Sequence, residues 1–100
     1  MEGEKTLIEF SITPIGNSEH VSDQVARCTR LVRESGIRNE LHAMGTILEG
    51  DLDGSLDVIK RCLRDVLRDS PRAAASIRID ARSNGENSVE ASVRSVEEKV

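Results

Sequence analysis

Residues 42–50 of the chain read HAMGTILEG and lie within an apolar, strand-like segment that runs from Ile37 to Gly50. Gly45 follows Met44 in the middle of this segment. Glycine weakens the interior of a strand and commonly marks a bulge or a tight turn. The segment is therefore expected to bend at Met44-Gly45 and to supply two strands of a sheet.

The preceding strand is indicated by residues 6–13, which alternate between apolar and polar side chains. Ile8, Phe10 and Ile12 fall on the apolar side, as in a strand with one buried face. The Pro14–Gly16 segment is expected to end this strand, because proline and glycine both interrupt regular structure.

Two amphipathic helices are expected, one on each side of the 37–50 segment. Ser18 or Ser22 can cap the first helix, and Gly36 closes it as a left-handed cap residue. Asp53 is the better cap for the second helix, which Ser70-Pro71 stops. The apolar stripes are Val21, Val25, Cys28, Leu31 and Val32 in the first helix, and Leu56, Ile59, Cys62 or Leu63, Val66 and Leu67 in the second.

A last strand is predicted over residues 74–80, with Ile77 and Ile79 directed inward, and Ser88 can cap a short C-terminal helix. The resulting order is βαββαβ with an extra C-terminal helix, which is the ferredoxin-like arrangement of an α/β (α+β) sandwich. Right-handed crossovers place both long helices on one face of the sheet. A chain of 100 residues has the size of one domain, so residues 1–100 are expected to form one ferredoxin-like domain.

The composition excludes several classes of partner. The net charge is -4 and Phe10 is the sole aromatic residue, so neither a basic surface nor stacking platforms are available for nucleic acid. No stretch reaches the roughly 20 apolar residues of a membrane helix. The first five residues are acidic in balance, unlike a secretory signal, so a cytoplasmic protein without membrane contact is expected.

The two cysteines, Cys28 and Cys62, are far apart in sequence and form no CxxC pair. They predict neither a zinc site nor a disulfide framework. Both fall on the apolar stripes of predicted helices, where a free cysteine behaves as a small hydrophobic residue. They are therefore expected to be buried core thiols.

The sheet face that the helices leave open is expected to be polar. Two interpretations of this face stay open: a cross-strand lattice of charges, or a site for a cationic or hydrogen-bonding small molecule. Its predicted residues are Glu9, Ser11, Glu40, His42, Glu49, Ser76, Arg78 and Asp80.

Catalytic machinery is not visible in the sequence. His42 stands alone, and a hydrogen-bonded strand residue is the favoured interpretation over a metal ligand or a proton shuttle. No serine or cysteine is paired locally with a base, and the glycines near residues 45 and 50 do not form a phosphate-binding loop. The chain is thus expected not to be an enzyme and to hold no metal or cofactor.

Three segments resemble the YkoF-like family of small thiamine-binding proteins: residues 11–16 (SITPIG), residues 42–50 (HAMGTILEG) and residues 77–82 (IRIDAR). The resemblance implies ferredoxin-like subunits that join into dimers and tetramers, some of which bind thiamine or its pyrimidine half. The ligand-binding positions that it suggests, with the nearby candidates, are Ser11, His42, Gly45, Thr46, Glu49 and Asp80.

The chemistry of thiamine suits several of these residues. Thiamine carries a permanent positive charge and an aminopyrimidine edge with donors and acceptors, which match the carboxylate of Glu49 and the hydroxyls of Ser11 and Thr46. Gly45 would let the backbone approach the ligand closely. Phe10 points to the helix-covered face, so stacking on the open face has to come from aliphatic side chains or a neighbouring subunit.

The expected function is therefore binding of a small molecule, thiamine or a related pyrimidine, on the polar sheet face of a homodimer or homotetramer. The alternative is a non-catalytic structural or regulatory assembly module without a dedicated ligand, in which the polar face is only a subunit interface.

Overall fold

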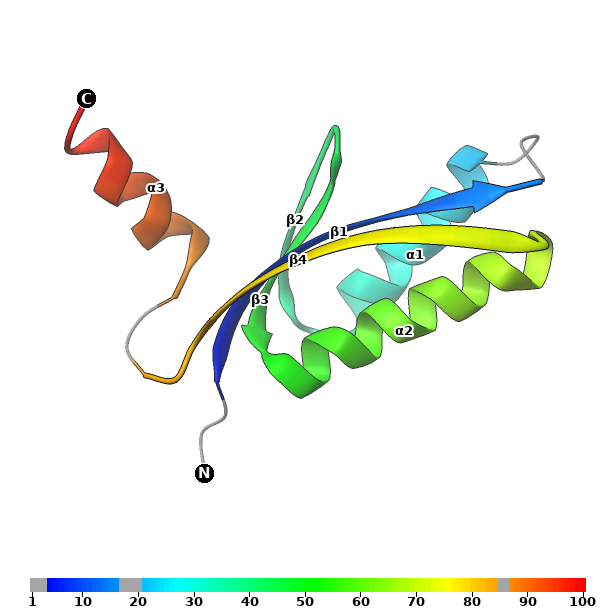
Figure 1. The fold of residues 1–100 in the computed structure, drawn as a ribbon, viewed down its shortest axis with the longest axis horizontal. Helices are drawn as coiled ribbons and strands as arrows, with labels where there is room; N and C mark the ends of the chain where they lie inside the picture. The colour runs from blue at the N-terminus through cyan, green and yellow to red at the C-terminus, as the bar shows by residue number, and fades with distance from the viewer. Residues whose placement is uncertain (1–3, 17–20, 85–86) are drawn as a thin grey trace.

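A computed structural model describes residues 4–16, 21–84 and 87–100 of the chain. These residues form a four-stranded antiparallel sheet with strand order β2-β3-β1-β4, and helices α1 and α2 pack beside each other on one of its faces (Figure 1). The ferredoxin-like βαββαβα arrangement predicted from the sequence is confirmed. The elements are β1 (Lys5–Ile15), α1 (Val21–Glu34), β2 (Arg38–His42), β3 (Gly45–Asp51), α2 (Leu52–Asp69), β4 (Arg72–Arg82) and α3 (Val89–Glu97).

The core lies between the sheet and the two long helices. Ile8 of β1 is opposite Leu48 of β3 and Ile79 of β4, so these three side chains share the helix-covered face. Burying one such side chain stabilises a fold by about 1.5–3 kcal/mol. Hydrophobic packing of this cluster is therefore the main interaction between the sheet and the helices. The buried members of the cluster are Ile8, Phe10, Val32, Leu48, Val58, Ile59 and Cys62.

The turn predicted at Met44-Gly45 is confirmed, since β2 ends at His42 and β3 begins at Gly45. Gly45 has φ +154°, and a Cβ atom there would lie 2.6 Å from the carbonyl oxygen of Phe10. The close approach of the turn to β1 therefore requires glycine at this position. Gly36 lies two residues after the end of α1 and has φ +77°, as its predicted role in closing that helix requires.

The prediction that Asp53 caps α2 is wrong. The cap is Asp51, whose side chain accepts a hydrogen bond from the Gly54 N–H at 2.9 Å. Because β3 passes directly into α2 without a loop, the last strand residue takes the capping position and Asp53 falls in the first turn. Ser22 lies inside α1 and does not cap it, whereas the alternative cap Ser18 lies outside the described residues. Ser88 caps α3, as predicted.

Both β1 and β4 extend further than the sequence pattern indicated. Pro14 does not end β1 but pairs with Ala73 of β4. Within the described residues β3 pairs with β1 only as far as Phe10, so this part of β1 has a single neighbour, a position where proline is tolerated. Ile77 and Ile79 of β4 face the helix side as predicted, yet each is 44% exposed because β4 is an edge strand.

Helix α3 lies apart from the two long helices α1 and α2 (Figure 1). It contains no buried side chain, and Val93 and Val96 are exposed. Among the described residues, no helix is both long and apolar enough to cross a membrane.

Candidate functional site

A small cavity lies where the β2–β3 turn faces α1 and has a volume of about 230 Å³. We refer to it as the hairpin cavity. It contains four of the six residues predicted as ligand-binding, namely Ser11, His42, Gly45 and Thr46. The other lining residues are Phe10, Ile12, Pro14, Gln24, Val25, Cys28, Thr29, Val32, Leu41, Ala43, Met44 and Val66.

The hairpin cavity exists because β1 continues beyond the start of β3. Phe10 is opposite Thr46, but the next residues of β1 have no partner on β3. Gly45 has no side chain to fill the space, and a Cβ atom there would contact the Cβ atom of Ser11 at 3.5 Å. Helix α1 closes the far side through residues such as Gln24 and Cys28. A strand end, a turn and a helix face thus enclose one space.

Gln24 is a buried polar residue in the wall of the hairpin cavity. It is only 1% exposed, and its side-chain Nε2 donates a hydrogen bond to Ser70 Oγ at 2.9 Å. Its Oε1 is buried and has no hydrogen-bond partner among the described residues. A buried polar atom without a partner costs about 1–3 kcal/mol, so the protein carries an acceptor that a ligand N–H could satisfy.

Gln24 was not among the predicted site residues, although a signal was available. It is a polar residue beside Val21, Val25 and Cys28 on the apolar stripe of a helix. A buried amide in such a stripe needs hydrogen-bond partners.

His42 stabilises the turn that forms the mouth of the hairpin cavity. Its Nδ1 accepts a hydrogen bond from the Met44 N–H at 3.1 Å, so the ring proton is on Nε2. Nε2 lies 3.2 Å from Glu9 Oε2, although the angles do not make this contact a hydrogen bond. The structure thus agrees with the interpretation of His42 as a hydrogen-bonded strand residue. Among the described residues, no three His, Cys, Asp or Glu side chains are grouped so that they could hold a metal ion.

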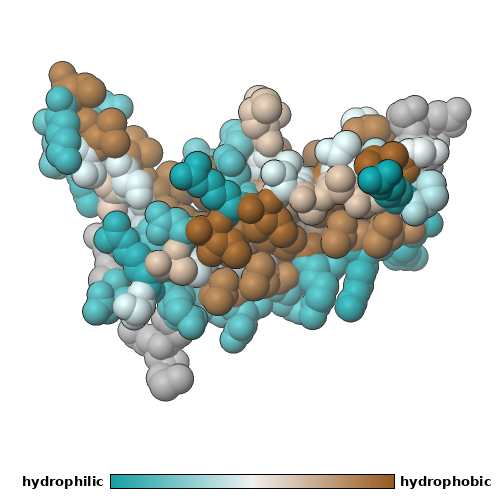
Figure 2. Space-filling view, viewed as in Figure 1, coloured by the Kyte–Doolittle hydropathy of each residue, from teal (hydrophilic) through white to brown (hydrophobic). Residues whose placement is uncertain are grey.

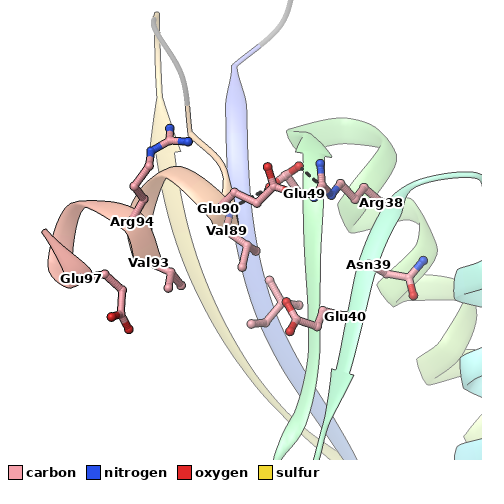
Figure 3. A pocket seen from close by; sticks show the side chains of 10 residues that line it. Arg38, Asn39, Glu40, Glu49, Val89, Glu90, Val93, Arg94 and Glu97 are labelled. Atoms are coloured by element: carbon pink, nitrogen blue, oxygen red, sulfur yellow. Dashed lines mark hydrogen bonds and ion pairs between the residues drawn. The ribbon is translucent and has the colours of Figure 1, made fainter.

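Glu49, the fifth predicted residue, lies on the opposite sheet face in a larger cavity of about 670 Å³ between β2, β3 and α3 (Figure 3). We refer to it as the α3 cavity. Glu49 Oε1 accepts the Val89 N–H at 2.7 Å, and Oε2 lies 3.4 Å from Arg38 Nε. The Glu49 carboxylate therefore holds the start of α3 against the sheet.

Arg38 links the same helix to the sheet. Its Nη2 lies 2.5 Å from Glu90 Oε1. This hydrogen bond is the largest cause that raises the pKa of Arg38, and the charge of Glu49 is the next. Asp80, the sixth predicted residue, is not among the residues that line either cavity. Its backbone carbonyl accepts a hydrogen bond from Asn87 Nδ2 at 3.0 Å.

A family model described as thiamine-binding protein matches residues 8–97 of the chain. The match includes every strand and helix except the first three residues of β1, and it includes the lining residues of both cavities. The chain belongs to this thiamine-binding protein family. Membership agrees with the resemblance noted from the sequence, and the family's description is that of a binding protein.

Individual relatives are similar over nearly their whole length. UPF0045 protein MJ1052 of Methanocaldococcus jannaschii is 36% identical over 94 residues, which cover 94% of each chain. Its crystal structure matches the present one with a TM-score of 0.86 over 94% of this chain and 97% of that chain. UPF0045 protein Mb1933 of Mycobacterium bovis is 36% identical, covering 91% of this chain and 90% of its own.

A Bacillus cereus structure, described as a domain of unknown function DUF77, is 31% identical with a TM-score of 0.83. The two chains are covered to 90% and 88%. These two solved structures therefore share the fold of this chain.

Proposed function

We propose that the protein binds thiamine, with the pyrimidine ring inside the hairpin cavity. Membership of the thiamine-binding protein family supports the ligand class. The location of the ligand in the hairpin cavity is supported by Gln24, whose buried Oε1 lacks a hydrogen-bond partner within the described residues. An aminopyrimidine supplies the N–H donor that this oxygen requires.

The remaining walls of the hairpin cavity suit a flat heteroaromatic ring. Phe10, Val32 and Val66 are apolar, while Ser11 and Thr46 provide hydroxyls that can donate to ring nitrogens. Binding sites commonly combine such apolar walls with a few placed polar groups. Phe10, the sole aromatic residue of the chain, is at this cavity and not on the open sheet face.

The size of the hairpin cavity bears on how much of thiamine it admits. Its volume of about 230 Å³ is below the roughly 300–1,000 Å³ of pockets for drug-sized ligands. One ring therefore occupies the cavity, and the charged thiazolium ring lies outside it, beyond the Ala43–Met44 turn. Glu49 belongs to the α3 cavity, so in this proposal it positions α3 and does not contact the ligand.

Calorimetric titration with thiamine and with its hydroxymethylpyrimidine fragment tests the proposal. Gln24→Met keeps the size of the side chain and removes the acceptor, so both ligands should lose affinity by about tenfold or more, which corresponds to about 1.4 kcal/mol. Ser70→Ala is the matched control, because it removes the Gln24–Ser70 hydrogen bond but leaves Oε1 in place.

Three outcomes discriminate between the sites. No heat from either ligand with the folded wild-type protein would reject thiamine binding. Unchanged affinity in Gln24→Met would reject the hairpin cavity as the site. If Glu49→Gln alone lost affinity, the binding site would be the α3 cavity. That cavity lies on the polar sheet face, where the ligand was predicted from the sequence.

The proposal includes self-association through β4. No strand of the described residues pairs with its outer edge, and Ile77 and Ile79 are each 44% exposed there. Figure 2 shows apolar side chains gathered over the middle of the molecule, where β4 runs in Figure 1. An unpaired, apolar edge favours pairing with a second copy, which would give a symmetric homodimer.

Light scattering after size-exclusion chromatography tests this part. Ile77→Lys should convert the dimer to a monomer, while Ser76→Lys, on the opposite face of the same strand, should not. If only Ser76→Lys dissociates the protein, the open sheet face is the interface. An oligomer with no affinity for either ligand would favour the assembly-module alternative. The cytoplasmic location is a separate prediction that this experiment does not test.

A further inference from the structure

The two cysteines of the chain, far apart in sequence, meet where α1 packs against α2. Cys28 Sγ lies 3.7 Å from the Cys62 carbonyl oxygen, and Cys62 Sγ lies 3.6 Å from the Cys28 carbonyl oxygen. Each thiol thus donates a weak hydrogen bond to the backbone of the other residue. Each sulfur atom lies within contact distance of the other residue's backbone, so the two side chains are direct neighbours, and such proximity is the first requirement of a disulfide.

The two thiols differ in access and in acidity. Cys28 is partly exposed and lines the hairpin cavity, whereas Cys62 is fully buried. The hydrogen bond with Cys62 lowers the pKa of Cys28, and this effect exceeds the opposing effects of burial and of the Asp65 charge. The hydrogen bond with Cys28 and burial raise the pKa of Cys62. Cys28 is therefore the thiol that ionises and meets a reagent first.

We propose that Cys28 and Cys62 are a peroxide-responsive dithiol pair that closes reversibly to a disulfide between α1 and α2. Hydrogen peroxide is the oxidant because a cavity of about 230 Å³ admits it, whereas a bulky peptide disulfide does not reach Cys28. This inference rests on the contacts of the two residues and is independent of the ligand proposed above.

The reaction has two steps. The Cys28 thiolate attacks one oxygen of the peroxide, so an S–O bond forms, the O–O bond breaks, and the leaving hydroxide takes a proton to become water. The Cys62 sulfur then attacks Cys28 Sγ, forming the S–S bond, while the sulfenic hydroxyl leaves with the Cys62 proton as a second water. The two thiols lose two electrons and two protons, and the peroxide is reduced to two waters.

The disulfide would fix one wall of the hairpin cavity. Cys28 lies one helical turn after Gln24, on the same side of α1. A bond to Cys62 therefore ties this wall covalently to α2 and removes the Cys28 thiol from the lining of the cavity.

Peptide mapping of the full-length protein tests the proposal. The reduced protein is desalted, treated with equimolar hydrogen peroxide, blocked with iodoacetamide and digested with trypsin without reductant. The expected product is peptide 28–30 linked to peptide 62–64, on a monomeric chain whose mass has fallen by two hydrogen atoms. Dithiothreitol should reverse this change, which distinguishes it from sulfoxide formation at the exposed Met44.

Single variants assign the roles, with circular dichroism confirming that each is folded. In Cys62→Ser, dimedone should trap a sulfenic acid at Cys28, because the second thiol is gone. In Cys28→Ser, Cys62 should stay unmodified under the same treatment. The proposal is overturned if the wild-type protein gives no linked peptide, if the disulfide joins two different chains, or if Cys62 alone reacts as fast as Cys28 alone.

Discussion

Gln24→Met should make the unliganded protein more stable while it weakens ligand binding. In the native protein, the unpartnered Oε1 costs about 1–3 kcal/mol, and the hydrogen bond from Nε2 to Ser70 contributes about 0.5–1.5 kcal/mol. Methionine has nearly the same shape and no amide, so both contributions disappear together. The freed Ser70 hydroxyl can rotate toward the terminal carbonyls of α2, which it follows directly.

The difference between these two contributions gives a gain of about 1 kcal/mol in the free energy of unfolding. For a chain of this size, such a gain raises the melting temperature by about 4–8 °C. Urea denaturation and thermal melts followed by circular dichroism measure both quantities. Ser70→Ala is the control and should lose about 1–3 kcal/mol, because it leaves the whole Gln24 amide buried without a protein partner.

A loss of more than about 1 kcal/mol in Gln24→Met would refute the reasoning, since Oε1 would then have a stabilising partner within the protein. The combination of higher stability and lower affinity is the result that identifies a residue retained for its ligand.

Three further predictions follow from the same contacts. Gly45→Ala should lower the free energy of unfolding by about 1–3 kcal/mol, because its Cβ atom would collide with the backbone of β1, and a thermal melt equal to that of the wild type would contradict this. Glu49→Gln should weaken the attachment of α3, so hydrogen exchange should accelerate in α3 and stay unchanged in the core strands, whereas uniform acceleration would argue against a local role. The rate of Cys28 alkylation should rise with pH around a midpoint below the roughly 8.5 of a free thiol, because its lowered pKa keeps more thiolate at a given pH. In Cys62→Ala the midpoint should move upward, and an identical pH profile in the two proteins would show that the Cys62 hydrogen bond does not set the acidity of Cys28.

Most of the fold could be predicted from local patterns. The alternation in β1 and the helical stripes identify the element order, and the glycine at position 45 identifies the turn. The errors fall where elements meet, since Asp51 and not Asp53 caps α2. Such boundaries depend on how neighbouring elements join, which the sequence pattern of one element does not contain.

The candidate site could be predicted only in part. The segment at residues 42–46 and Ser11 were identified from the sequence and lie together at the hairpin cavity. Glu49 was expected beside them, but strand alternation and the position of α3 place it in the α3 cavity. Gln24 was missed because its burial depends on the packing of α1 against the end of α2, which lies 46 residues further along the chain.

The sequence by itself determined the order of strands and helices, the turn between β2 and β3, and the apolar face of each element. These features depend on interactions between residues that are close in sequence. Only the tertiary structure decided that Gln24 meets Ser70, that Cys28 meets Cys62, and which sheet face holds Glu49. The physical reason is that strand register and helix packing bring together residues that are distant in sequence, and neither is specified by local periodicity.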